Sequence, residues 1–130
     1  MNEQEIFDNL KSAVRQYRYT IQGKWLNDIQ WEAVPVTFKE TLPGHIAGMY
    51  SCGKIVLLHA DISTIFPIYV HELRHRWQWQ NNPLKYLVGK ILLFRRLIEN
   101  DADREQQKAD DWYCGYMDKL RSAKKGNQTA

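Results

Sequence analysis

The residues of this chain whose types and spacing could do chemistry lie at positions 71–75, which read His-Glu-Leu-Arg-His. On a helix, His71 and His75 lie one turn apart on the same face, and both imidazoles can reach one metal ion at about 2.0–2.1 Å. Glu72 lies about 100° around the helix from His71, where it faces a water on the metal. The pattern predicts one zinc ion per chain, held by the two histidines.

A hydrolytic reaction follows from these positions. Zinc lowers the pKa of its bound water toward about 7. Glu72 is the expected catalytic base: it accepts a proton as the hydroxide attacks a carbonyl, and it delivers that proton to the leaving amine. The motif therefore predicts hydrolysis of a peptide bond, with a peptide or a protein as the substrate.

A catalytic zinc also needs a third protein ligand and an open position. No histidine follows His75, so the candidates are a downstream carboxylate, Cys114, or one of the upstream histidines, His45 and His59. We favour Glu99. It follows His75 by 24 residues, which leaves room for the chain to turn and return to the site.

Other interpretations of this region stay open. Asp103 lies one turn after Glu99 and is predicted to accept the second ring N–H of a ligand histidine. Glu105 is the alternative third ligand, because it falls on the expected buried stripe of the last helix, where an unpaired carboxylate is costly. Glu99 could instead be a carboxylate near a helix N-terminus that pairs with Arg95 or Arg96.

The motif at 71–75, followed by Glu99-x-x-Ala102-Asp103, resembles the pattern of the gluzincin zinc peptidases. The chain is most similar to the very small single-domain members called minigluzincins. Many of these are encoded in phages and mobile elements as metallopeptidases of unknown substrate. The ImmA/IrrE peptidases share a similar compact plan. The resemblance covers about residues 45–112.

The resemblance implies a zincin-like α+β fold: a helix, a small twisted three-stranded sheet, an active-site helix, and a C-terminal helix that brings the glutamate. By position, it implies that His71, His75 and Glu99 bind zinc. Glu72 would be the general base, and Asp103 would orient a ligand. A substrate peptide would pair, as an added strand, with the strand before the active-site helix. The residues in that place are Ile46, Ala47, Gly48, Met49, Tyr50 and Ser51.

Two features depart from the family pattern. Arg74 is charged at a position that zinc-peptidase helices usually keep uncharged. The sequence also offers no obvious C-terminal subdomain to close the cleft. The missing subdomain, the small size and the basic clusters support a second hypothesis: a zinc-stabilised regulatory or binding module, for a protein or nucleic-acid partner, with little or no turnover. In a third and weaker hypothesis, the motif occurs by accident in a nucleic-acid-binding protein.

The elements that must position these residues follow from hydrophobic periodicity and turn signals. Residues 2–18 predict an amphipathic helix. Three strands are expected at 34–38, 46–51 and 54–59, and the last two form a hairpin with its turn near Cys52-Gly53. Residues 60–80 lead into the helix that carries the motif, with Asp61 or Ser63 as its cap, Pro67 in its first turn, and Asn81-Asn82-Pro83 as its stop signal.

The sequence predicts the structure of the C-terminal third of the chain less clearly. Residues 84–98 fit a loop, an apolar helix or a strand. A last helix is expected from Ile98 to Leu120. Residues 122–130 are small and polar and predict a disordered tail, which leaves 1–121 as a single domain. The expected buried stripe of the last helix is Ala102, Glu105, Ala109, Trp112, Tyr116 and Leu120.

Composition excludes several classes of protein. The chain has 130 residues, 44% hydrophobic and 25% charged, which is typical of one soluble domain. No run approaches about 18 apolar residues, so no membrane span is expected. The acidic N-terminus is unlike a signal peptide, and two cysteines make no disulfide framework. We expect a cytoplasmic protein, in the host cytoplasm if it is phage-encoded. The net charge of +3 permits nucleic acid without favouring it.

Hydrolysis also needs a donor that stabilises the oxyanion. The sequence offers four candidates and does not choose among them: Tyr113, Tyr116, His45 and His59. Gln78 lies seven residues after His71, so it could line the cleft.

Overall fold

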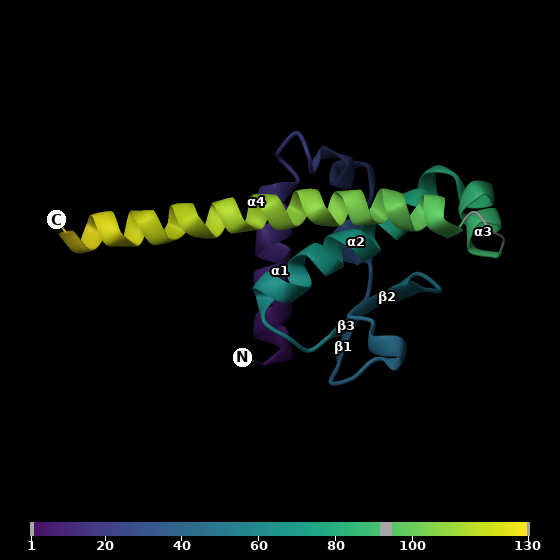
Figure 1. The fold of residues 1–130 in the computed structure, drawn as a ribbon, viewed down its shortest axis with the longest axis horizontal. Helices are drawn as coiled ribbons and strands as arrows, with labels where there is room; N and C mark the ends of the chain where they lie inside the picture. Colours follow the sequence, from purple (N-terminus) through teal and green to yellow (C-terminus); the bar gives the residue numbers. More distant parts are fainter. Residues whose placement is uncertain (1, 92–94, 130) are drawn as a thin grey trace.

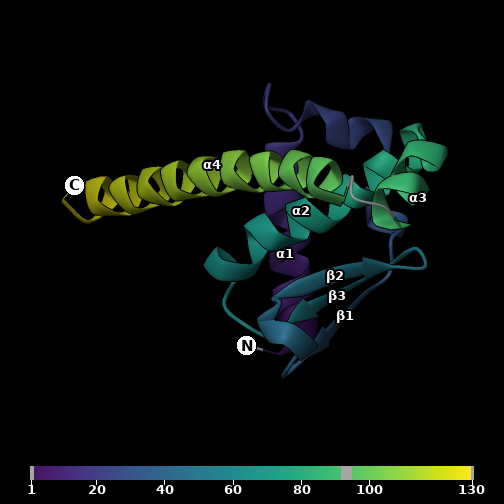
Figure 2. The same cartoon turned by 45° about the vertical axis from the view of Figure 1, so that its right-hand side comes forward.

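Over residues 2–91 and 95–129, which the computed structural model describes, the chain folds into four α-helices and a three-stranded mixed sheet (Figure 1). The α+β class predicted from the sequence is confirmed. α2 lies between α4 on one side and the sheet on the other, and α1 packs against it as well (Figure 2). The helix that carries the His-Glu-Leu-Arg-His motif is therefore the centre of the fold.

α1 (Glu3–Tyr17) matches the amphipathic helix expected at its place. The side chain of Asn2 caps it by accepting a hydrogen bond from the Glu5 N–H at 2.8 Å. Fully burying a large apolar side chain stabilises a protein by roughly 1.5–3 kcal/mol, and this helix buries a continuous stripe. Its members are Ile6, Leu10, Ala13, Val14 and Tyr17.

The sheet contains β1 (Val36–Lys39), β2 (Gly48–Ser51) and β3 (Lys54–Leu58) in the order β1-β3-β2. β3 pairs in parallel with β1 and antiparallel with β2. The β2–β3 hairpin turns at Cys52 and Gly53, whose φ angles are +53° and +78°. Two successive left-handed residues match the twist of the strands. The predicted hairpin is thus confirmed, and it leaves β2 at an edge.

α2 (Ile62–Asn81) begins after Asp61, which occupies the N-cap position and accepts hydrogen bonds from the hydroxyls of Ser63 and Thr64. The helix ends before Asn82-Pro83, as predicted. Pro67 lies in its second turn rather than its first, because the helix begins at Ile62. The N–H that proline lacks would bond to the carbonyl of Ser63, and Ser63 is exposed, so water can take its place.

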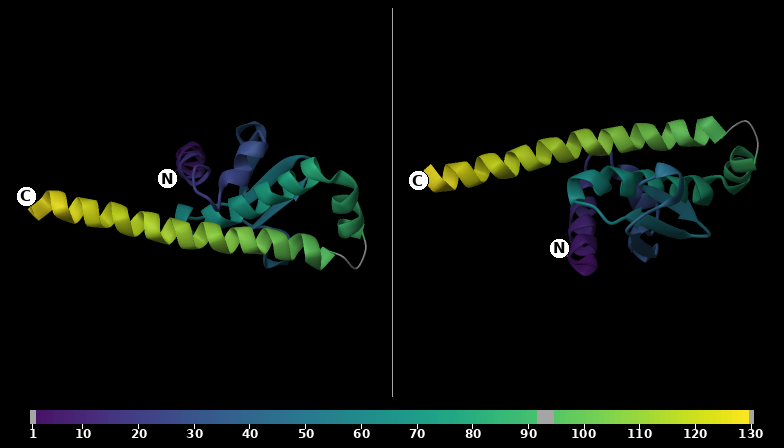
Figure 3. Two further views of the ribbon diagram at one scale, coloured as in Figure 1. Left: turned by 90° about the horizontal axis from the view of Figure 1, so that it is seen from above. Right: turned by 60° about the horizontal axis from the view of Figure 1, so that its bottom comes forward.

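α3 (Pro83–Ile91) gives a helix in most of the region that the sequence left open. α4 (Arg95–Thr129) begins before the predicted start at Ile98 and continues past the predicted end at Leu120 (Figure 3). Residues 122–129 are helical where a disordered tail was expected. Extending an existing helix adds a hydrogen bond per residue without a new nucleation step. Residues 92–94 and 130 of these predictions lie outside the described residues.

The buried face of α4 follows the predicted stripe only in its first half. Ala102, Glu105 and Ala109 are buried, and small alanines let α4 approach α2 closely. Leu120 is 44% exposed, so the prediction was wrong there. The helix has left the body of the molecule by that point. Trp112 and Tyr116 are only partly buried, and Tyr113, which the predicted stripe left out, is buried against Phe66.

Candidate metal centre

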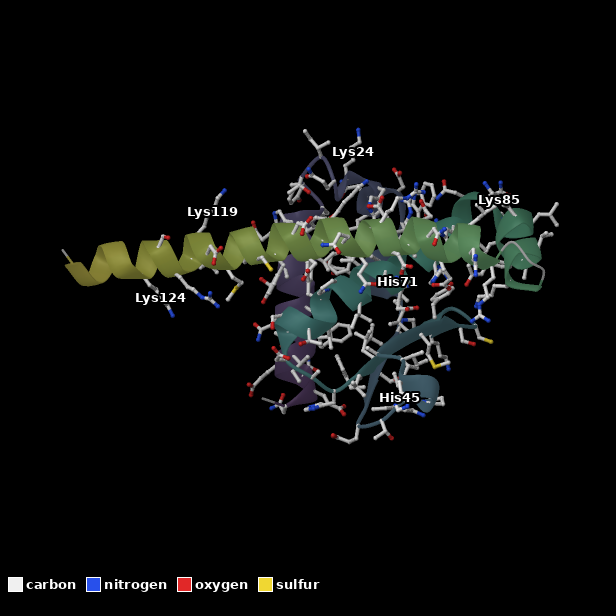
Figure 4. The ribbon with its side chains drawn as sticks, viewed as in Figure 1. Lys24, His45, His71, Lys85, Lys119 and Lys124 are labelled. Atoms are coloured by element: carbon white, nitrogen blue, oxygen red, sulfur yellow. The ribbon has the colours of Figure 1, made fainter. Side chains whose placement is uncertain are left out.

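His71 and His75 project from the middle of α2 toward the same carboxylate on α4. The Nε2 atom of His71 lies 3.1 Å from Oε2 of Glu99, and the Nε2 atom of His75 lies 3.2 Å from Oε1. The two imidazole centroids are 4.9 Å apart. Figure 4 shows His71 at the place where α2 passes beneath α4. The structure therefore brings together the three residues that the sequence analysis named as zinc ligands.

The donor atoms at this place fit a metal ion. Ligands on a tetrahedral ion with bonds of about 2.0–2.1 Å lie about 3.3 Å from one another, close to both distances from Glu99. His71, Glu72 and His75 form a cluster whose ligand atoms lie within 4.8 Å of each other. A second such group consists of His71, Glu99 and Asp103. Imidazole nitrogens with carboxylate oxygens suit a divalent transition metal.

Glu72 lies beside the two histidines and is 6% exposed. Its Oε1 is 3.8 Å from Nε2 of His71, farther than the oxygens of Glu99. Burial raises the pKa of Glu72, although His71 and His75 act in the opposite direction. Its carboxylate is therefore more basic than that of an ordinary glutamate, which suits proton transfer near neutral pH.

Gly48 brings the backbone of β2 directly against this part of α2. A Cβ at this position would lie 2.7 Å from Cγ2 of Ile68 and 3.1 Å from Cδ2 of Leu57. The same point is 3.5 Å from Cγ of Glu72. Only glycine fits here without displacing its neighbours. The strand named as the substrate strand is thus adjacent to Glu72.

His71 has one carboxylate behind its ring. Its Nδ1 lies 3.2 Å from Oδ1 of Asp103, but no aligned hydrogen bond forms, and this nitrogen is buried without a partner among the described residues. Burial lowers the pKa of His71, but the hydrogen bond that its ring donates to Glu99 and the charges of Glu72, Glu99 and Asp103 outweigh it, so the pKa is raised overall. Asp103 lies where the sequence analysis expected it, on the far side of the ring from Glu99.

His75 has a longer chain of partners behind its ring. Its Nδ1 lies 2.8 Å from Oε1 of Gln78. That amide oxygen can only accept, so Nδ1 carries the proton and Nε2 keeps a free lone pair. The Nε2 of Gln78 donates to the carbonyl of Ile98 at 3.0 Å and to Oδ2 of Asp101 at 2.9 Å. Gln78 therefore orients His75, whereas the sequence analysis considered it as a residue lining the cleft.

Arg74 completes this chain of partners. Its Nε and Nη2 donate to Asp101 at 2.7 and 3.2 Å, and its guanidinium lies 3.8 Å from the ring centre of Trp77 and 5.0 Å from that of Trp25. The charge that departs from the family pattern thus binds α4 and two aromatic rings. Arg74 and Trp77 are thus in contact with each other within the fold.

Glu105, the alternative third ligand, is not brought to the histidines. It is buried and accepts a hydrogen bond from Nε1 of Trp25 at 2.9 Å, and Lys108 lies 3.3 Å from its other oxygen. Its burial is therefore satisfied without a metal. Within the described part of the chain, Glu99 forms no ion pair with Arg95 or Arg96.

The other candidate residues lie elsewhere. His45 is exposed in a short 3-10 helix (Pro43–His45), at the opposite edge of the molecule from α4 (Figure 4). His59 and Cys114 line a groove between α1, the start of α2 and α4. Tyr113 and Tyr116 line the same groove and belong to an aromatic cluster with Trp112. None of the four expected oxyanion donors is brought to His71.

Tyr86 of α3 is a residue at this site that the sequence analysis missed. Its ring centroid lies 6.1 Å from that of His75, and its hydroxyl is buried without a hydrogen-bond partner among the described residues. Burial raises the pKa of Tyr86, and the charges of Tyr50, Glu72 and Glu99 raise it further. The hydroxyl thus stays protonated near both carboxylates. No signal marked it, since it falls in the region whose structure the sequence left open.

No protein-family model, curated protein or solved structure matches this chain. Over the described residues, none of the helices combines the length and the apolar character that a membrane crossing requires.

Proposed function

We propose that this protein is a zinc-dependent peptidase of gluzincin type, in which His71, His75 and Glu99 hold the ion. The observation that supports this most is the meeting of the two Nε2 atoms with the Glu99 carboxylate, at 3.1 and 3.2 Å. Zinc is the metal proposed because two imidazoles and one carboxylate, with an open fourth position, are the ligand set of catalytic zinc sites.

In the proposed hydrolysis, different residues of the chain have different roles. Zinc, when bound, supplies a Lewis acid at neutral pH. Glu72 takes a proton from the attacking water and passes it to the leaving amine. Gln78 orients the His75 ring by accepting from its Nδ1, and Asp103 lies behind the His71 ring without an aligned hydrogen bond. The edge of β2 aligns the substrate as an added strand.

Tyr86 is the proposed donor to the developing oxyanion. Three buried hydroxyls have no partner among the described residues: those of Tyr17, Tyr69 and Tyr86. The pKa of each is raised chiefly by burial, but only that of Tyr86 is also raised by Glu72 and Glu99. A donor waiting at the site without a partner is what stabilisation of a transient charge requires.

The test begins with metal content. Wild-type protein purified without added metal is expected to carry about one zinc per chain by elemental analysis. Glu72→Gln is then expected to keep the zinc and to lose peptide hydrolysis by about 10²–10⁴-fold, and Tyr86→Phe by about 10²–10³-fold. A Glu72→Gln variant that cleaves as fast as wild type would sink the mechanism. A wild-type protein that takes up no zinc would contradict the proposed zinc site.

A second candidate function is a zinc-stabilised binding module with little or no turnover. A groove of about 830 Å³ between α1, the start of α2 and α4 favours this function. The proposed zinc ligands His71, His75 and Glu99 do not line this groove, and neither does Glu72. In this case chelation lowers the melting temperature, while Glu72→Gln leaves the biological activity intact. The Glu72→Gln variant therefore separates the two candidates.

A further inference from the structure

β2 presents backbone groups along one edge. It pairs with β3 on one side, and no other described strand lies along its second edge. The Leu58 N–H donates to the carbonyl of Ala47 at 2.9 Å. Because bonded and non-bonded pairs alternate in an antiparallel ladder, the N–H and C=O groups of Gly48 and Tyr50 point away from β3. An extended peptide could bond to these groups.

Two cations lie on either side of Tyr50. Nζ of Lys90, from α3, donates to the Tyr50 carbonyl at 3.4 Å and lies 5.2 Å from the ring centre of Tyr86. Nη1 of Arg76, from α2, donates to the Tyr50 hydroxyl at 3.4 Å. Neither cation forms an ion pair with any carboxylate of the described residues. Apart from the contact of Lys90 with the Tyr86 ring, the hydrogen bonds of these charges within the described part of the chain are long and join them to a neutral residue.

These cations and the candidate base lie against the same strand, β2. Glu72 and Arg76 lie one turn apart on α2, and they face Gly48 and Tyr50, respectively, on β2. Gly48 and Tyr50 are two residues apart, which is about 6.8 Å along an antiparallel strand. Figure 2 shows the β2–β3 hairpin extending toward α3, from which Lys90 comes. A peptide that lies along β2 and reaches Glu72 therefore also passes Arg76 and Lys90.

We propose that Arg76 and Lys90 make this edge selective for peptides with an acidic side chain opposite Tyr50. The inference rests on the proposed function, because it uses the same substrate strand, β2. A carboxylate would form a charge-assisted hydrogen bond with either cation, and such bonds are shorter and stronger than the present contacts. Antiparallel pairing is the slightly more stable arrangement. It places the acidic residue on the amino-terminal side of the cleaved bond, two residues before the one that faces Glu72.

Binding to the zinc-loaded Glu72→Gln protein tests the inference without cleavage. The probes are two eight-residue alanine–glycine peptides that differ only by Glu or Gln at one central position. The Glu peptide is expected to bind about fivefold more tightly at low salt, and added salt is expected to reduce the difference. Replacing both cations, Arg76→Gln with Lys90→Gln, is expected to remove it. Lys85→Gln, on an exposed lysine of the same helix as Lys90, is the matched control and keeps the preference.

Equal affinity for the two peptides, or failure of both to bind, overturns the proposal. So does a preference that survives in the double variant. A parallel cleavage assay on the zinc-loaded wild-type protein keeps this inference separate from the proposed function. Cleavage without charge preference rejects the acidic subsite and leaves the peptidase. Glu-selective binding without cleavage of either peptide supports the subsite and counts against the peptidase.

Discussion

The two histidines of the candidate site come from one helix and face one carboxylate, yet they are supported differently. Behind His75 stand Gln78, Asp101 and Arg74, joined by hydrogen bonds of 2.7–3.2 Å. Behind His71 stands Asp103 alone, with a side chain 62% exposed and no aligned hydrogen bond. The motif gives both rings the same position relative to the metal. The packing of α4 on α2 determines how firmly each ring is held.

The two imidazole rings therefore differ in what fixes their orientation. The tautomer of His75 is fixed before any metal arrives, because Gln78 accepts from Nδ1. His71 takes its orientation mainly from Glu99. In the metal-free protein, the two imidazoles, chiefly through the hydrogen bond with His71, hold the pKa of Glu99 well below its usual range, so this carboxylate is ready as an anionic ligand.

Removal of a ligand is expected to have the largest effect. His71→Ala and His75→Ala should each lower the affinity for zinc by more than about 100-fold, beyond the range seen when supporting partners are lost. Elemental analysis of the purified variants measures this, with circular dichroism as a check on folding. A variant that still carries one zinc per chain would remove that histidine from the site.

Gln78→Ala is expected to weaken zinc binding by about 10–100-fold, because the Nδ1 of His75 loses its acceptor. Competition with a chromophoric chelator gives the affinity. Gln80→Ala is the matched control: this glutamine lies two residues farther along α2 and is exposed. If the two variants bind zinc equally well, the hydrogen bond between His75 and Gln78 does not contribute to zinc affinity.

Arg74→Leu is expected to have a smaller effect, because Arg74 lies two hydrogen bonds farther from His75 than Gln78 does, through Asp101. Zinc affinity should fall by about tenfold at most, and the free energy of unfolding by about 1–3 kcal/mol, since two charge-assisted hydrogen bonds are lost. Arg104→Leu is the control. Arg104 lies 3.7 Å from the same carboxylate with a side chain 73% exposed, so its loss should change the free energy of unfolding by about 0.5 kcal/mol or less. Urea titration compares the two.

Asp103→Asn is expected to have the smallest effect, about threefold or less on zinc affinity, because Asp103 is exposed and makes no aligned bond to His71. The same chelator competition measures it. An effect as large as that of Gln78→Ala would mean that the two histidines are held equally firmly, and the comparison between them would fail.

Local spacing was sufficient for part of the site. An H-E-x-x-H motif places His71 and His75 on one helix face whatever the surroundings. Glu99 was predicted from its distance along the chain and from the resemblance to the gluzincin pattern, and the structure places it between the two rings. The role of Gln78 could not be predicted, because it depends on Ile98 and Asp101 of α4, which are distant in sequence.

The elements of the fold also divide into those that local sequence signals predict and those that depend on distant contacts. Helix 2–18 and the Cys52-Gly53 hairpin have strong local signals, and both were predicted correctly. The region 84–98 has apolar residues without a clear period, so Tyr86 was missed. Leu120 kept the helical period of the buried stripe, but periodicity does not reveal where the partner surface ends.

The length of α4 has a consequence for the rates at which its backbone amide hydrogens exchange with solvent. A helix of 35 residues spans about 52 Å, and it holds Glu99 and the buried Ala102 near one end, while residues 118–124 are exposed. Amide hydrogens in the buried turns around Ala102 and Ala109 can exchange with deuterium only when the core opens, whereas those beyond Met117 need only local fraying. A gradient of exchange along one continuous helix would therefore mark where the body of the protein ends. Zinc should slow exchange at the Glu99 end alone.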